Sequence, residues 1–175
     1  DGLIAMETVD ISQNFDISQY SSSVADGYTA LHGIVAALRS AGLEKQLSCS
    51  GGYITSIGDL VAGQPNYMSG WMCAVNDKLI PVGVSQFALS AGDELVLFWS
   101  QGLDNQQYAK WDVRKATVRT GEKLTLSALI APLDVEELGV ELPFVAVGTE
   151  KLALRVYVDG KEYTNHIAQS KNQID

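Results

Sequence analysis

The sequence is poor in basic residues, in cysteine and histidine, and in long apolar runs. Its 175 residues include 12 Lys and Arg against 21 Asp and Glu, with only two Cys and two His. The net charge of −9 leaves no basic face for phosphate contacts, which excludes nucleic-acid binding and an anionic membrane surface. Apolar clusters such as 95–99 are strand-sized, whereas a membrane helix needs roughly 18 apolar residues. We therefore expect no membrane insertion.

The two cysteines, Cys49 and Cys73, form no CxxC pair and have no His at metal-ligand spacing. A structural zinc site is therefore not expected. A disulfide between them would close a loop of about 24 residues and stabilise the fold by roughly 3–4 kcal/mol in the chain-entropy model. The alternative is two small buried thiols on separate strands, and the residues leave both readings open.

Charge divides the chain into two parts. Residues 1–106 hold 3 basic and 11 acidic residues, whereas residues 107–175 hold 9 and 10. The change falls in the polar stretch 101–107, which is typical of a linker. We predict one domain over 1–101 and a second over 108–175.

The first domain is predicted to hold one helix among several strands. Leu31, Ile34, Val35 and Leu38 recur at helical spacing, with Thr29 as a plausible N-cap and Gly42 just past the end. One or two strands are predicted within 3–19, and others at 52–57, 71–75 and 94–99, with turns at 76–78 and 91–93. This order favours an α+β fold, a small sheet with one helix across it.

The second domain has the pattern of an all-β module. Residues 151–158 and 123–129 alternate between apolar and polar, and Asp159-Gly160 is a strong hairpin signal. The spacing suggests an immunoglobulin-like sandwich. Because about 65 residues is short for a complete one, we expect this module to be truncated, docked on the first, or both.

One series of motifs carries a family resemblance. Gly51-Gly52-Tyr53-Ile54-Thr55-Ser56-Ile57 is followed by Gly70-Trp71-Met72-Cys73-Ala74-Val75-Asn76-Asp77 and by Gly92-Asp93 before a final strand. Together with the helix start at Thr29, this series resembles the transcobalamin-like C-terminal domain family over about residues 5–100. Two positions depart from the family pattern: Cys73 stands where Tyr is frequent, and Asp77 where Gly is usual.

The resemblance implies a β-grasp-like fold and raises the expectation of binding over catalysis. The family consists mostly of bacterial surface or secreted modules, and its name comes from cobalamin carriers in which a similar domain covers one face of a corrinoid. The step from such a fold to a ligand is an analogy.

A cluster of aromatic and sulfur side chains is the candidate ligand-binding region. Tyr67, Met68 and Trp71 could form a flat apolar patch for a planar ligand or a partner, although Trp71 and Met68 could equally be core residues. Tyr53 would add a further contact, and Asn66 and Asn76 would be polar partners.

Groupings suited to catalysis are sparse. Cys49 with His32 is a conceivable nucleophile and base, and Cys73 is kept as a candidate because it departs from the family pattern. The carboxylates are scattered, and the acidic run 134–137 suits a solvated loop or, less well, calcium. We expect that the protein is not an enzyme and that it binds no cofactor and no metal.

The sequence therefore predicts a non-enzymatic binding or adhesion module of a bacterial cell-surface or secreted protein, with a protein or glycan partner. The alternative is a small-molecule carrier for a corrinoid or another planar ligand.

Overall fold

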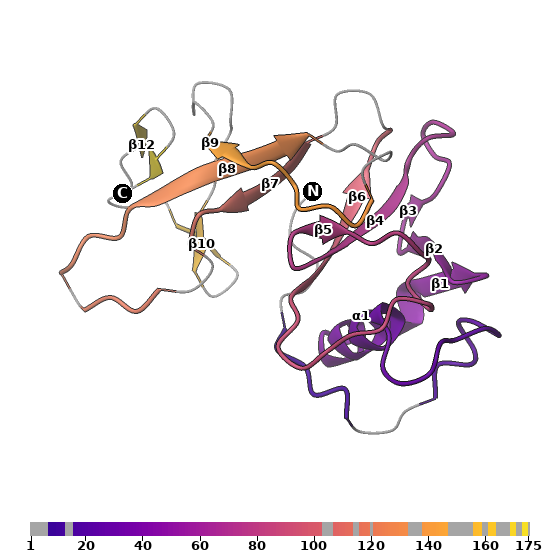
Figure 1. Ribbon diagram of the computed structural model, residues 1–175. Helices are drawn as coiled ribbons and strands as arrows, with labels where there is room; N and C mark the ends of the chain where they lie inside the picture. The colour runs from indigo at the N-terminus through magenta and orange to yellow at the C-terminus, as the bar shows by residue number, and fades with distance from the viewer. Residues whose placement is uncertain are drawn as a thin grey trace. The chain divides into compact units, whose positions relative to one another are not determined.

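The computed structural model describes residues 7–12, 16–102, 107–113, 116–119, 121–132, 138–146, 156–158, 161–163, 169–170 and 173–174. The chain divides into two compact units: Asp1–Gln106 with Asp134–Leu142, and Gln107–Leu133 with Pro143–Asp175. The described residues form one α-helix, a short 3-10 helix and thirteen short strands in antiparallel pairs (Figure 1). A sheet-rich α+β architecture is therefore confirmed, while the β-grasp and immunoglobulin-like assignments stay predictions.

The helix α1 spans Ala30–Ser40, as the apolar periodicity predicts. Thr29 is its N-cap, and the Thr29 backbone N–H donates to His32 Nδ1 at 3.0 Å. At the other end Gly42 has φ +73°, which suits a glycine just beyond a helix. Burial lowers the pKa of His32, so the neutral form, whose Nδ1 can accept a hydrogen bond, is favoured in the folded state.

Two three-stranded sheets belong to the first unit. One has the order β1-β2-β3, formed by Leu47–Ser50, Tyr53–Ile57 and Leu60–Val61. The other has the order β5-β4-β6, formed by Lys78–Leu79, Gly70–Val75 and Leu95–Ser100. The strands predicted at 52–57, 71–75 and 94–99 are thus present within one or two residues.

A single hydrophobic core joins α1 to both sheets. Its buried members come from the helix, from β1, β2 and β4, and from the loops: Ile17, Ala30, Leu31, Ile34, Val35, Leu38, Leu47, Ile54, Ile57, Trp71, Cys73 and Val84. Burying one Leu, Ile or Val side chain is worth roughly 1.5–3 kcal/mol before entropy is counted. The apolar stripe of α1 is therefore a large part of what holds the sheets together.

The turn between β4 and β5 lies where the sequence places it. Asn76 and Asp77 have φ +50° and +63°, as a two-residue hairpin turn of type I′ requires. Asp tolerates this left-handed region better than most residues, so the departure from the usual Gly at position 77 leaves the turn intact.

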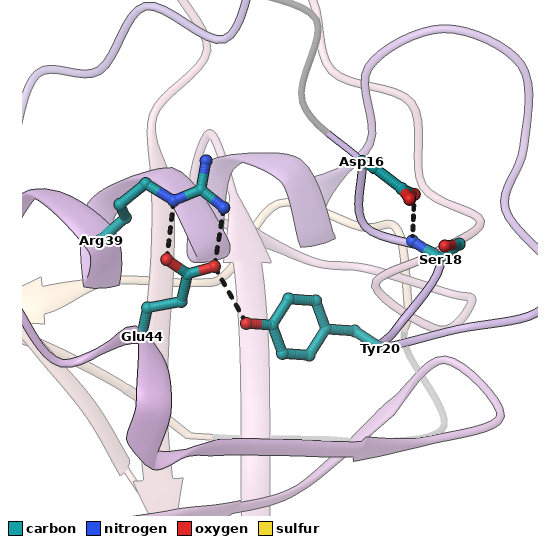
Figure 2. Close-up of polar contacts among 5 residues, drawn as sticks. All are labelled: Asp16, Ser18, Tyr20, Arg39 and Glu44. Carbon is teal, nitrogen blue, oxygen red and sulfur yellow. Dashed lines mark hydrogen bonds and ion pairs between the residues drawn. The ribbon is translucent and has the colours of Figure 1, made fainter.

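The strands predicted within 3–19 are wrong for the residues described there. Residues 7–12 and 16–19 contain no strand. Asp10 accepts a hydrogen bond from the Ser12 N–H at 2.9 Å. Asp16 accepts one from the Ser18 N–H at 2.7 Å (Figure 2). Such local side-chain bonds turn the backbone and compete with a strand ladder.

A charged cluster fixes the far end of the helix. The Glu44 carboxylate, in the 3-10 helix Glu44–Gln46, accepts two hydrogen bonds of 2.7 Å from Arg39 and one of 3.1 Å from the Tyr20 hydroxyl (Figure 2). The Arg39 hydrogen bonds lower the pKa of Glu44. The cluster ties the segment before α1 to the segment after it.

A short return segment completes the first unit. The Gly139 N–H donates to the Leu79 carbonyl at 2.8 Å, and the Leu142 N–H donates to the Asp77 carbonyl at 3.1 Å. Leu142 is 7% exposed. The predicted second domain, 108–175, includes residues 138–142, but these residues extend the edge of β5. Pairing between positions so far apart leaves no local signal.

The second unit is built around β7 and β8, which span Gln107–Trp111 and Leu126–Pro132. β9 (Val145–Ala146) pairs with β8, and β12 (Gln169–Ser170) and β13 (Gln173–Ile174) extend the same sheet. β10 (Val156–Val158) pairs with β11 (Lys161–Tyr163), with Asp159-Gly160 between them lying outside the described residues, as do 151–155 and 134–137. β8 begins three residues later than the start of the predicted strand 123–129.

Acid should loosen the start of the helix. Because the folded pKa of His32 lies below its ordinary value of 6.5, stability is lost as the pH falls below 6.5. Protonation at Nδ1 also removes the hydrogen bond from the Thr29 N–H, worth about 1 kcal/mol. We expect His32→Gln, which can still accept that bond, to flatten the fall in unfolding free energy between pH 7.5 and 5. An unchanged pH dependence in the variant would contradict this role.

The return segment should contribute to the stability of the first unit. Leu142→Ala should lower its unfolding free energy by about 2–3 kcal/mol. The matched control Leu138→Ala, at a 39% exposed position, should cost less than about 0.5 kcal/mol. Urea unfolding followed by tryptophan fluorescence in a Trp111→Phe background reports the first unit alone. Equal effects of the two variants would show that the segment does not stabilise it.

Candidate functional site

The loop 62–69, between β3 and β4, is held in place by hydrogen bonds. Asn66 Nδ2 donates to the Gln101 carbonyl at 2.5 Å, and Ser69 Oγ donates to the same carbonyl at 3.2 Å. Asn66 Oδ1 accepts from the Met68 N–H at 2.9 Å, and the Gly63 N–H donates to the Ser69 carbonyl at 2.7 Å. The loop is thereby fixed to itself and to the end of β6.

The braced loop presents two apolar side chains to solvent. Tyr67 is 88% exposed and Met68 is 40% exposed. Leu60 and Val61 of β3 are also more than a third exposed. A ring that is 88% exposed adds little packing to the fold, so Tyr67 is a candidate contact residue.

Tyr53, the first residue of β2, reaches Gly70, the residue that follows this loop. Its side chain is 46% exposed. A Cβ atom added at Gly70 would collide with the Tyr53 hydroxyl, so the end of the tyrosine lies directly over Gly70. The glycine at the start of β4 therefore makes room for Tyr53 to lie across from one sheet to the other.

Trp71 belongs to the core and not to an exposed patch. It is 6% exposed, and its ring packs edge-on against Trp99 with ring centroids 5.2 Å apart. Its Nε1–H donates to the Leu60 carbonyl at 3.3 Å. The predicted flat patch of Tyr67, Met68 and Trp71 is corrected accordingly: only Tyr67 and Met68 face solvent.

The two asparagines predicted as polar partners are engaged in the fold. Asn66 braces the loop, as described. Asn76 Nδ2 donates to Asp93 at 2.7 Å, and Asn76 Oδ1 accepts from the Glu94 N–H at 3.0 Å. Asn76 thus joins the β4–β5 turn to the turn before β6, a position of structural value.

A cavity of about 200 Å³ opens beside Tyr53. Its walls come from the start of β2, the centre of β4, the segment 80–84 and β6. The lining residues are Gly52, Tyr53, Ile54, Trp71, Met72, Cys73, Ile80, Val82, Gly83, Val84 and Leu97. Of these, Tyr53 and Trp71 belong to the predicted ligand-binding set and Met72, Ile80 and Val82 do not, although the glycines at 52 and 83 signal a close approach of backbones.

Both thiols are free, so the disulfide between Cys49 and Cys73 is not formed in the structure. Cys49 lies on β1 and Cys73 on β4, in different sheets, as the alternative of two separate thiols describes. Burial raises the pKa of Cys49 to about 11 and that of Cys73 to about 12. Raised values disfavour the thiolate that a nucleophile requires.

A second, shallow hollow lies at the N-terminal end of α1 and is polar. Its lining includes Asp16, Asp26 and His32. His32 is engaged with Thr29 there, and its ring lies edge-on to Tyr28. Within the described part of the chain, no group of three or more His, Cys, Asp or Glu side chains could hold a metal ion.

Comparison with known proteins covers the first unit. Residues 32–101 match a family model described as a domain of unknown function (DUF4430). No curated protein and no solved structure matches the chain. The match agrees with the expectation of a family of unknown function, whereas the transcobalamin-like resemblance stays a prediction. Among the described residues, no helix has the length and apolar character needed to cross a membrane.

Both thiols, Cys73 buried and Cys49 partly buried, should resist alkylation while the protein is folded. Relative to the ordinary value of 9.0, the raised pKa values reduce the thiolate fraction about 100-fold at Cys49 and about 1,000-fold at Cys73. Iodoacetamide at pH 8 should label both cysteines in urea and neither in buffer, as read by mass spectrometry. Since the folded state keeps protons that the unfolded state releases, stability should fall as the pH rises above 9. Rapid labelling of a cysteine in the folded protein would instead support an enzyme with a cysteine nucleophile.

Proposed function

We propose that this chain is a non-enzymatic binding module of a bacterial cell-surface or secreted protein. Its contact surface consists of Tyr53, Tyr67 and Met68 on the first unit. The partner is a protein or a glycan.

The exposure of Tyr67 carries the proposal. A tyrosine with 88% of its surface in solvent, on a loop held by side-chain and backbone hydrogen bonds, has already lost most of its backbone freedom. Binding through such a residue costs little further ordering entropy. Aromatic residues on fixed loops are frequent anchors of interfaces and of sugar or planar-ligand contacts.

Several observations support a function without catalysis. The pKa values of both thiols are raised, and Nδ1 of His32 accepts the Thr29 N–H at the start of the helix. Neither arrangement activates a nucleophile.

The surface or secreted location rests on composition and resemblance. The first unit is strongly acidic, with 11 acidic and 3 basic residues in 1–106. Such a surface repels nucleic acid and anionic lipid and favours solubility. The motif series of 51–93 adds the likeness to bacterial surface modules.

A corrinoid carrier is the second candidate function. The exposed faces of Tyr67 and Met68 favour it, since a planar macrocycle could lie over them. The cavity of about 200 Å³ is below the roughly 300–1,000 Å³ of an enclosing small-molecule site. A corrinoid would therefore rest on the surface of this unit, and a second surface would be needed to enclose it.

Replacing Tyr67 should remove binding without changing stability. The probes are a printed glycan array, a random-peptide phage library and cyanocobalamin followed by its visible spectrum. Tyr67→Ala should weaken any binding at least tenfold, the loss expected for a central aromatic contact. Asn66→Ala should weaken it less, because it frees the loop but leaves the ring. Tyr28→Phe, at another exposed tyrosine, is the matched control.

The three probes separate the candidates. Tyr67-dependent binding to glycan or peptide supports the leading proposal, and Tyr67-dependent binding of cyanocobalamin alone favours the carrier. Binding that survives Tyr67→Ala unchanged, or no binding to any probe, overturns the assignment of this surface.

A further inference from the structure

The cavity beside Tyr53 has a lining without charge. Its eleven lining residues are glycine, aliphatic, aromatic, methionine or cysteine. At the floor, Ile54 is 2% exposed, Trp71 6% and Cys73 7%. At the mouth, Tyr53 and Val82 are 46% and 48% exposed. The cavity is therefore open to solvent on one side and apolar inside.

The walls are held in place by backbone hydrogen bonds. The Val84 N–H donates to the Gly52 carbonyl at 3.1 Å, which fixes the segment 80–84 to the start of β2. The Ile80 N–H donates to the Cys73 carbonyl at 3.1 Å, which fixes the same segment to β4. A Cβ at Gly83 would lie 3.0 Å from the Gly52 carbonyl oxygen, so the two backbone segments are as close as glycine allows.

These bonds also satisfy backbone carbonyl groups at the cavity walls. The carbonyls of Gly52 and Cys73 already accept hydrogen bonds. Within the described residues, no buried side-chain nitrogen or oxygen lacks a partner. A charged or strongly polar occupant would lose its hydration and find no counterpart here.

Size limits the occupant further. An apolar cavity of about 150 Å³ is large enough to bind benzene. The cavity here, at about 200 Å³, matches one small ring or one branched aliphatic group. A drug-sized ligand or a corrinoid is too large to enter it.

We infer that this cavity binds a single uncharged hydrocarbon group of about the size of benzene, such as the aromatic or branched side chain of a partner polypeptide. The inference rests on the proposed binding function and specifies the group that the partner inserts. Tyr53 places the cavity beside the exposed loop, because its ring lines the mouth and its hydroxyl lies over Gly70.

Methionine methyl groups give a direct test. Met72 lines the cavity, whereas Met68 lies outside its lining and is 40% exposed. In protein labelled with [13C-methyl]methionine, toluene should shift the Met72 resonance saturably through its ring current and leave Met68 unmoved. N-acetyl-phenylalanine amide and N-acetyl-leucine amide test an amino-acid side chain as the source. Benzylamine, which is charged, should bind at least tenfold more weakly than toluene.

Two variants locate the effect. Leu97→Phe fills the cavity from its wall and should abolish the Met72 shift. Since that change could unfold the unit, Val82→Phe at the exposed mouth provides the second variant, with at least a tenfold loss expected. Tyr28→Phe, at an exposed tyrosine outside the cavity lining, is the control and should leave toluene binding unchanged.

Different experimental results would overturn this inference and the proposed function. If no hydrocarbon shifts Met72 in folded protein, the cavity inference is overturned even when Tyr67-dependent partner binding persists. If toluene binds but the two amino-acid amides do not, the cavity serves a free small molecule and the side-chain source is wrong. Amide binding that is lost in Val82→Phe supports the inference, whether or not Tyr67→Ala affects a partner.

Discussion

The packing of α1 against two small sheets is the constraint on which the first unit depends. Each sheet has three strands, and β3 and β5 have only two residues each. Sheets of this size are marginal without a second layer. The stripe of Leu31, Val35 and their neighbours supplies that layer, so the inner faces of β2 and β4 are committed to the helix.

That commitment determines what remains for binding. Ile54 and Trp71 point into the core, and the alternation along β2 leaves Tyr53 facing outward. Tyr53, one residue before Ile54, is half exposed, and Gly70, one residue before Trp71, makes room for its hydroxyl. The exposure of Tyr53 is therefore a consequence of the strand alternation that builds the core, whereas Tyr67 and Met68 are exposed on the loop 62–69.

The parts of the fold that sequence predicted are those with local causes. The helix follows from periodicity and from Thr29 and Gly42 at its ends, and β4 and β6 follow from short apolar runs between turns. The strands expected in 3–19 failed because Asp10 and Asp16 bond to backbone two residues on, a competing local preference that alternation does not reveal.

The candidate site divides in the same way. Of the residues that the sequence proposed for ligand contact, Tyr53, Tyr67 and Met68 are exposed, but the sequence could not separate them from Trp71, whose burial depends on a helix distant in the chain. The sequence proposed Asn66 and Asn76 as polar ligand partners, because residue type alone does not distinguish an asparagine that binds a ligand from one that holds a loop in place. The cavity depends on hydrogen bonds from Val84 and Ile80 to residues on other strands, and only the fold brings these together.

The loop 62–69 and the cavity share one physical property. Both are fixed before binding, the loop through Asn66 and Ser69 and the cavity wall through backbone bonds of the segment 80–84. Association costs about 0.5–1.5 kcal/mol for each flexible side chain that it immobilises, and surfaces fixed beforehand avoid much of that cost. A contact area as small as Tyr67, Met68 and the cavity mouth can then support specific binding, because little of its interaction energy is spent on ordering. Tyr53 lies between the two features, because its ring lines the cavity and its hydroxyl lies over Gly70, the residue that follows the loop.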